Sequence, residues 1–114
     1  MKENRKQMAG EVIRELAGKF LAENSTSKAS LMTVTKVSIS PDRANAKIYF
    51  TTLPESGEKG ALDFAKRHRS EFRQYLKDNS LLSRIPFIDF DIDYGERNRQ
   101  NIEEISKRAG SFEA

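Results

Sequence analysis

Residues 31–51 read LMTVTKVSISPDRANAKIYFT and hold two segments rich in β-branched side chains on either side of a turn. In the first segment the apolar positions change phase by one residue between Val34 and Val37, which predicts a strand over 31–40 with a β-bulge. Pro41-Asp42-Arg43 supplies typical turn residues. In the second segment apolar and polar residues alternate, with the apolar ones at Ala46, Ile48 and Phe50. The stretch therefore predicts a β-hairpin with one apolar face.

Helical patterns flank this hairpin. Residues 4–23 carry apolar side chains at helical spacing opposite charged ones, which predicts an amphipathic helix with Asn4 as its N-cap. After the hairpin, Ser56 is expected to cap a helix near 58–68. A run of six polar residues then interrupts the apolar stripe. We therefore expect a kink around Ser70, which would cap a second short helix near 71–78.

The clearest strand pattern of the chain comes next, over residues 87–94. Its apolar side chains are Ile88, Phe90, Ile92 and Tyr94, and aspartates occupy the opposite face. Residues 96–109 predict a last, weakly buried helix, and the residues from Gly110 onward a frayed tail. The order helix, strand, strand, helix, kink, helix, strand is that of a type II KH domain. We therefore predict an α+β fold with a three-stranded sheet backed by helices.

The length of 114 residues suits one hydrophobic core. Residues 1–114 are therefore predicted to form a single domain, in which 96–114 are a weakly packed helix and tail. The core is expected to contain Val12, Ile13, Leu16, Phe20, Val37, Ile48, Phe50, Leu62, Phe72, Leu76, Phe90 and Ile92.

Composition excludes several classes of protein. The absence of cysteine rules out a disulfide framework, a thiolate zinc site and a cysteine nucleophile, and it suits the cytoplasm. Neither a signal peptide nor a run of apolar residues long enough to span a membrane is present. The net charge of +3 and the pI of about 9.3 permit nucleic-acid binding without requiring it.

Several short motifs of the chain occur together in one known family. They are Val34-Thr35, Val37, Ser40-Pro41-Asp42, Ala46-Lys47-Ile48-Tyr49-Phe50, Phe72-Arg73, Pro86-x-Ile88-x-Phe90-x-x-Asp93 and, in the first helix, Arg5. With this combination the chain resembles bacterial ribosome-binding factor A over roughly residues 5 to 106. Two positions depart from the family pattern. His68-Arg69-Ser70 replaces the family's Ala-x-Gly at the kink, and Ser83 replaces an arginine, with Arg84 one position later.

The resemblance implies a cytoplasmic, monomeric assembly factor without a cofactor. Such a factor binds the free 30S ribosomal subunit, assists maturation of the 5′ end region of 16S rRNA or its precursor, and supports growth in the cold. The alternative is a KH-like protein-interaction module that does not bind RNA directly.

The candidate RNA-binding residues surround the predicted kink: Lys66, Arg67, His68, Arg69, Ser70, Arg73 and Lys77. Clustered lysines and arginines bind phosphates, although a solvated helix face is the commoner role of such a run. With the family resemblance the balance favours RNA. His68 lacks a neighbouring nucleophile or acid pattern, so we predict no catalytic residue and no enzyme.

Two other patterns are assigned structural roles. Gly57-Glu58-Lys59-Gly60 matches the Gly-x-x-Gly loop of KH domains but opens a helix straight after a strand, so we interpret it as a turn. Asp89, Asp91 and Asp93 alternate along one strand face and are spread too widely for one metal ion. We predict no metal site and expect Asp93 to brace the turn after the strand.

Overall fold

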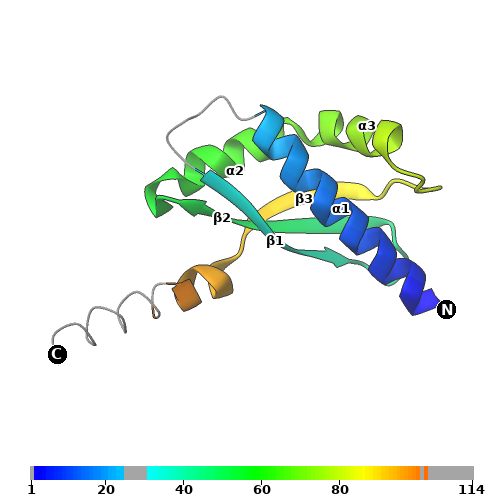
Figure 1. Ribbon diagram of the computed structural model, residues 1–114, viewed down its shortest axis with the longest axis horizontal. Helices are drawn as coiled ribbons and strands as arrows, with labels where there is room; N and C mark the ends of the chain where they lie inside the picture. Colours follow the sequence, from blue (N-terminus) through cyan, green and yellow to red (C-terminus); the bar gives the residue numbers. More distant parts are fainter. Residues whose placement is uncertain (1, 25–30, 101, 103–114) are drawn as a thin grey trace, which may run out of the picture.

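The structure is a computed structural model that describes residues 2–24, 31–100 and 102, with only the backbone described for residues 2–7. Its elements are α1 (Lys2–Asn24), β1 (Leu31–Ile39), β2 (Asn45–Leu53), the 3-10 helix η1 (Glu55–Gly57), α2 (Glu58–Arg67), α3 (Arg69–Asn79) and β3 (Phe87–Ile92). Residues 94–100 are also helical. Figure 1 shows α1 crossing β1, while α2 and α3 lie against β3. The predicted α+β fold of type II KH order is confirmed.

The sheet has the strand order β1-β2-β3, with β2 in the centre. β1 and β2 are antiparallel, and their register shifts between Val34 and Lys36, so Thr35 is the extra residue of a β-bulge. β2 and β3 are parallel, with Ala46 opposite Ile88 and Phe50 opposite Ile92. The predicted hairpin and its bulge are therefore confirmed.

The turn of this hairpin is held by side chains. Asp42 Oδ1 accepts hydrogen bonds from Ser40 Oγ at 2.6 Å and from Ala44 N at 3.0 Å. Ser40 Oγ in turn accepts one from Asn45 N at 3.0 Å. Arg43 takes a positive φ of 59°, which this tight turn requires. The turn chemistry expected from Pro41-Asp42-Arg43 is thus provided mainly by the aspartate.

The core lies between the sheet and the three helices. Eight of the twelve predicted core residues are buried: Ile13, Phe20, Ile48, Phe50, Phe72, Leu76, Phe90 and Ile92. The other four, Val12, Leu16, Val37 and Leu62, are partly buried. The core also includes residues that the prediction omitted: Ala17, Leu21, Ala46, Ala61, Ala65 and Ile88. Most of these are alanines, whose small side chains let helices approach the sheet closely.

Three details of the predicted element ends are wrong. β3 stops at Ile92, and Tyr94 is 52% exposed because it begins the helical segment 94–100 instead of continuing the strand. Ser56 lies in η1, and α2 starts after Gly57 without a side-chain cap. α1 begins at Lys2, so Asn4 is inside the helix and does not cap it. Most of the helix predicted over 96–109, and the tail after it, falls outside the described residues.

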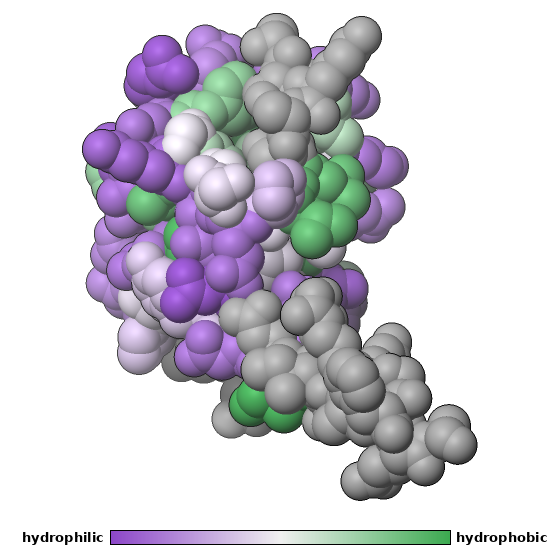
Figure 2. Space-filling model, turned by 90° about the vertical axis from the view of Figure 1, so that its left-hand side faces the viewer, coloured by the Kyte–Doolittle hydropathy of each residue, from purple (hydrophilic) through white to green (hydrophobic). Residues whose placement is uncertain are grey.

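The two leucines that end the hairpin are exposed. Leu31 and Leu53 are register partners, with exposed fractions of 65% and 72%. Figure 2 shows the left-hand end of the molecule in Figure 1, where small hydrophobic patches are surrounded by hydrophilic residues.

Within the described ranges, no helix has the length and apolar character needed to cross a membrane.

Truncation of Phe90 tests the central position of β3. Phe90 is fully buried, and its ring centroid lies 5.9 Å from that of Phe72. Phe90→Ala is expected to lower the free energy of unfolding by about 3 to 5 kcal/mol, because it removes buried contacts and leaves a cavity. Urea denaturation would measure the change. Phe87→Ala is the matched control, since Phe87 is in the same strand but 58% exposed. Equal losses in both variants would contradict the placement of β3.

Candidate nucleic-acid interface

The kink between α2 and α3 lies at His68. Its φ is −103° and its ψ is 15°, while its N–H donates to Ala65 O at 3.1 Å and its C=O accepts from Phe72 N at 2.9 Å. A negative φ is open to any L-residue, so this kink needs no glycine. Ser70 lies inside α3, and the expectation that it marks the kink and caps the helix is wrong.

The His68 ring packs against α2 at the kink. Its Nδ1 lies 2.7 Å from Phe64 O, and because a carbonyl can only accept, Nδ1 carries the hydrogen. The ring also packs on Phe64, with the two centroids 4.3 Å apart. Only Nε2 is therefore free to meet a ligand.

Cations on α2 face solvent just before the kink. A shallow hollow there is lined by Gly60, Asp63, Lys66, Arg67 and Arg69. Lys66 and Arg67 are exposed, and neither forms an ion pair with a described residue. Arg69 is different: its Nη1 lies 3.2 Å from Asp89 Oδ1, and its Nε donates to Lys66 O at 3.1 Å. Lys66 and Arg67 thus offer free positive charge, whereas Asp89 partly neutralises Arg69.

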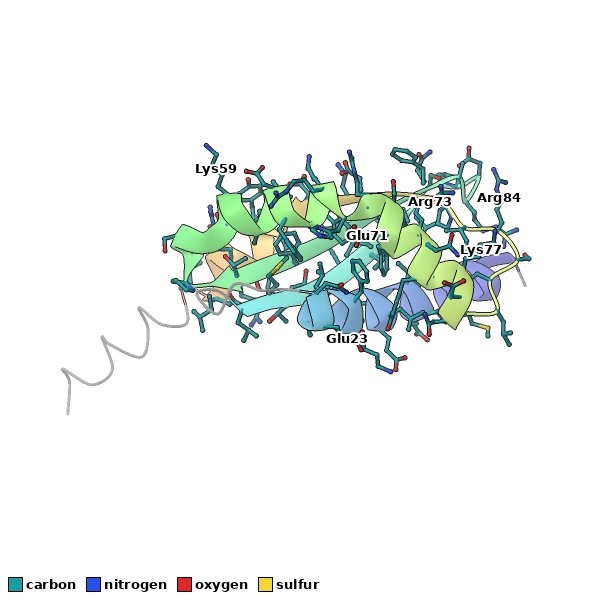
Figure 3. All side chains as sticks on the ribbon, turned by 90° about the horizontal axis from the view of Figure 1, so that it is seen from above. Glu23, Lys59, Glu71, Arg73, Lys77 and Arg84 are labelled. Atoms are coloured by element: carbon teal, nitrogen blue, oxygen red, sulfur yellow. The ribbon has the colours of Figure 1, made fainter. Side chains whose placement is uncertain are left out.

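Arg73 supports the chain between α3 and β3. Its Nε donates to Pro86 O at 3.1 Å, and its Nη2 donates to Ile85 O at 3.2 Å. Lys77, one turn further along α3, is exposed and has no partner among the described side chains. Figure 3 shows Arg73 and Lys77 at the same end of the molecule as Arg84. Of the predicted cations, Lys66, Arg67 and Lys77 are therefore available to a ligand, and Arg73 holds the fold.

The aspartates of β3 have partners within the protein. Asp89 pairs with Arg69, and Asp91 Oδ2 lies 3.9 Å from Lys47 Nζ. The buried Asp93 accepts hydrogen bonds from Thr35 Oγ1 at 2.5 Å and from Glu96 N at 3.0 Å. The second bond caps helical segment 94–100, so the expected role of Asp93 in bracing the following turn is confirmed.

The electrostatic state of Asp93 follows from these contacts. Burial raises the pKa of its carboxyl, but the hydrogen bonds from Thr35 and Glu96 and the nearby positive charge of Lys36 outweigh burial. The net pKa is lower than that of an ordinary aspartate, and the group is a carboxylate at neutral pH.

Two exposed arginines outside the predicted set also come together. Arg43, in the hairpin turn, and Arg84, in the segment before β3, line the same groove. They are far apart in sequence, and no local pattern indicates their proximity. Only the pairing of β2 with β3 places the two segments side by side.

A comparison with protein families now identifies the group to which the chain belongs. The family model for Ribosome-binding factor A matches residues 4–106. The chain belongs to this family.

Individual relatives of the ribosome-binding factor A family extend over most of the chain. The factor of Coxiella burnetii is 26% identical over 109 residues, 96% of this chain and 92% of that protein. The factor of Burkholderia cenocepacia is 27% identical over 110 residues, 95% and 81% of the two chains. The match to the Burkholderia multivorans factor is 34% identical but shorter, at 64 residues, 56% of this chain and 47% of that relative.

Solved structures of similar fold agree with this assignment. The crystal structure of ribosome-binding factor A from Thermus thermophilus has a TM-score of 0.68 at 21% identity, and the match covers 76% of this chain and 93% of that one. A Thermotoga maritima protein solved by NMR has a TM-score of 0.61 at 26% identity, with 75% and 83% covered. The chain therefore shares its fold with these two structures.

The role of Arg73 in this family member can be tested by truncation. Arg73→Ala is expected to lower the free energy of unfolding by about 1 to 2 kcal/mol, because two backbone carbonyls lose their charged donor. Lys77→Ala is the control on the same exposed helix face and should change stability by less than about 0.5 kcal/mol. Denaturant titration of both variants measures this, and an unchanged Arg73→Ala midpoint would contradict the structural role.

Asp93 predicts a specific acid response. A carboxyl whose folded pKa is lowered contributes stability that is complete above its unfolded pKa, about 3.9 for aspartate, and is lost as the pH falls through the folded value. At pH 7, Asp93→Asn should therefore be less stable than the parent, by about 1.5 to 3 kcal/mol. This difference should shrink as the pH falls below about 4.

Thermal melting across a pH series would measure that difference. Asp63→Asn is the control, because it removes the charge of an aspartate whose side chain is exposed. A stability gap between Asp93→Asn and the parent that stayed constant down to strongly acidic pH would show that the charge of Asp93 is not responsible.

Proposed function

We propose that this chain is an assembly factor of the small ribosomal subunit. It binds the free 30S subunit, assists maturation of the 5′ end region of 16S rRNA, and supports growth in the cold. It acts in the cytoplasm as a monomeric single domain, and it needs neither a cofactor nor a catalytic step. Membership of the ribosome-binding factor A family supports association with the ribosome. The observation that carries the RNA contact is a set of exposed cations without an ion-pair partner among the described residues: Lys66 and Arg67 just before the kink, and Lys77 in the last turn of α3.

Two features support phosphate binding at the kink. Lys66 and Arg67 are exposed in the last turn of α2. Arg67 Nε donates to Asp63 O at 3.4 Å, which leaves its Nη1 and Nη2 groups to a phosphate. α3 begins directly after His68 without a side-chain cap, which leaves N–H groups of its first turn available to an anion. Together these groups favour contact with the RNA backbone over reading of a base sequence.

Binding of this kind acts on rRNA by favouring one of its conformations over another. A protein that contacts one arrangement of RNA phosphates more favourably than another shifts the equilibrium between them, and only by the difference in affinity. The contacts of the His68 ring fit a role in binding better than a role in catalysis. The only hydrogen bond of its ring in the described part of the chain is with Phe64 O, and no carboxylate orients the ring as a base.

The proposal predicts a salt-dependent loss of binding in a charge-reversal variant. Lys66→Glu, Arg67→Glu and Lys77→Glu combined should abolish co-sedimentation with 30S subunits, and the parent should bind 30S in preference to 50S subunits. Each phosphate contact contributes about 0.7 to 0.9 to the slope of log affinity against log salt concentration, so the three contribute about 2 to 3. Arg69 and Arg73 are left unchanged because they contact Asp89 and backbone carbonyls.

The control for this experiment reverses three exposed cations elsewhere: Arg14 and Lys19 of α1 and Lys59 at the start of α2. It has the same net charge as the test variant and should retain 30S binding. If both variants lose binding equally, the effect is due to net charge and the interface is elsewhere. Binding of the parent that is insensitive to salt would instead favour the protein-interaction module without direct RNA contact.

A further inference from the structure

A groove with apolar walls lies at the opposite end of α3 from the kink. It has a volume of about 660 Å³ and runs between the N-terminal half of α1 and the segment from Asn79 to Pro86. Its apolar walls are formed by Met8, Val12, Leu16, Ile39, Leu81 and Leu82. Leu81 is fully exposed, and Met8 is 65% exposed. The groove therefore leaves large apolar side chains in contact with water.

The wall opposite α1 is held in place by hydrogen bonds. Ser80 Oγ donates to Leu76 O at 2.6 Å and accepts from Leu82 N at 3.3 Å, which fixes the chain as it leaves α3. The bonds from Arg73 to the carbonyls of Ile85 and Pro86 fix the other end of this segment. The groove is thus preformed, which lowers the entropic cost of filling it.

Positive charge lines the same groove. Arg43 and Arg84 both lie along it, and neither is paired with a carboxylate of the described residues. Asp42 accepts hydrogen bonds from Ser40 and Ala44, and these bonds, with a smaller contribution from the positive charge of Arg84, hold the pKa of its carboxyl below the ordinary value. Arg84 thus acts on Asp42 without forming a direct ion pair with it. Among the described residues of the lining Glu15 is the one acidic side chain, and it lies 3.6 Å from Lys19 of its own helix. The groove therefore combines apolar walls with two guanidinium groups that form no direct ion pair with a described residue.

We propose that this groove docks an acidic amphipathic helix of a protein partner. The apolar face of the helix covers Met8, Leu81 and Leu82, and its carboxylates pair with Arg43 and Arg84. The stretch of α1 from Met8 to Leu16 is about 12 Å long, which matches about two turns of a bound helix. The groove is separate from the proposed RNA contact of Lys66 and Arg67 at the kink, whereas Lys77 lies in the last turn of α3, next to the end of the groove at Asn79.

The residues that line the groove favour a helix over two other occupants, which are unpaired nucleic-acid bases and a second copy of the chain. Unpaired bases are bound by stacking on aromatic rings, and none of the described residues that line the groove is aromatic. A second copy of the chain would bring its own Arg43 and Arg84 to the interface, and like charges oppose that pairing unless acidic residues are interposed.

The test uses two synthetic helical peptides of about 14 residues with identical leucines at positions i, i+3, i+4 and i+7. One carries glutamates beside the leucines, and the other carries lysines at the same positions. Fluorescence anisotropy with the whole chain measures their affinities. The acidic peptide is expected to bind about tenfold or more tightly than the basic one. Chemical-shift changes should map to residues 8–16 and 79–86.

Variants of the chain assign the charge contact. Arg84→Glu should weaken the acidic peptide by about tenfold and strengthen the basic one. Leu81→Asp should weaken both peptides and should leave the fold intact, because Leu81 is fully exposed. Lys59→Glu, which carries the same charge change at the other end of the molecule (Figure 3), should alter neither affinity.

Four outcomes would overturn the proposal. They are equal affinity for the two peptides or no binding of either, shift changes outside the groove, displacement of the acidic peptide by an RNA oligonucleotide at the same residues, and self-association of the chain that Leu81→Asp abolishes. The third result would assign the groove to nucleic acid, and the fourth to a second copy.

Discussion

The central strand β2 is the constraint on which the rest of the structure depends. It pairs with β1 along one edge and with β3 along the other, and its inward side chains Ala46, Ile48 and Phe50 are buried. α1 packs on β1, whereas α2 and α3 pack near β3. Each helix is therefore positioned through a strand that β2 holds. The kink at His68 and the groove beside α1 keep their geometry only while this pairing is intact.

A second link joins the bulge of β1 to the end of β3. The register shift at Thr35 turns its hydroxyl to Asp93, and Asp93 in turn caps the helical segment 94–100. Arg97 of that segment pairs with Glu58 at the start of α2, with 3.0 Å between Nη1 and Oε1. One buried carboxylate thus connects β1, β3 and the segment that reaches α2. The β-bulge of β1 therefore helps to hold the end of β3 in place.

The cations of α3 show that a charged run can serve two purposes. Arg73 and Lys77 are one turn apart on the same exposed helix, yet Arg73 donates to two carbonyls and Lys77 has no described partner. The difference arises because Arg73 lies beside the segment that returns to β3. A basic pattern in a sequence therefore overstates the number of side chains available to RNA, since part of the charge stabilises loops.

The local order of the structure was predictable from residues close together in sequence. Alternating apolar side chains over 45–50, the phase change at Thr35 and the helical spacing in α1 depend on backbone periodicity alone, and these predictions are confirmed. The core residues followed from the same periodicity. Element ends were less predictable, because the competition between a strand and a cap at Asp93, or between Ser70 and His68 at the kink, is decided by neighbouring elements.

The candidate RNA-binding site was likewise only partly predictable from the sequence. The concentration of positive charge between Lys66 and Lys77 can be seen in the sequence, since charge is a property of the residues. Which of these cations lack an ion pair or a carbonyl partner depends on the fold, because Asp89 and the carbonyls of Ile85 and Pro86 come from a different segment. The fold alone also brought Arg43 and Arg84 to one groove. These contacts join residues that are distant in sequence. They depend on the pairing of β2 with β3, which local sequence patterns do not reveal.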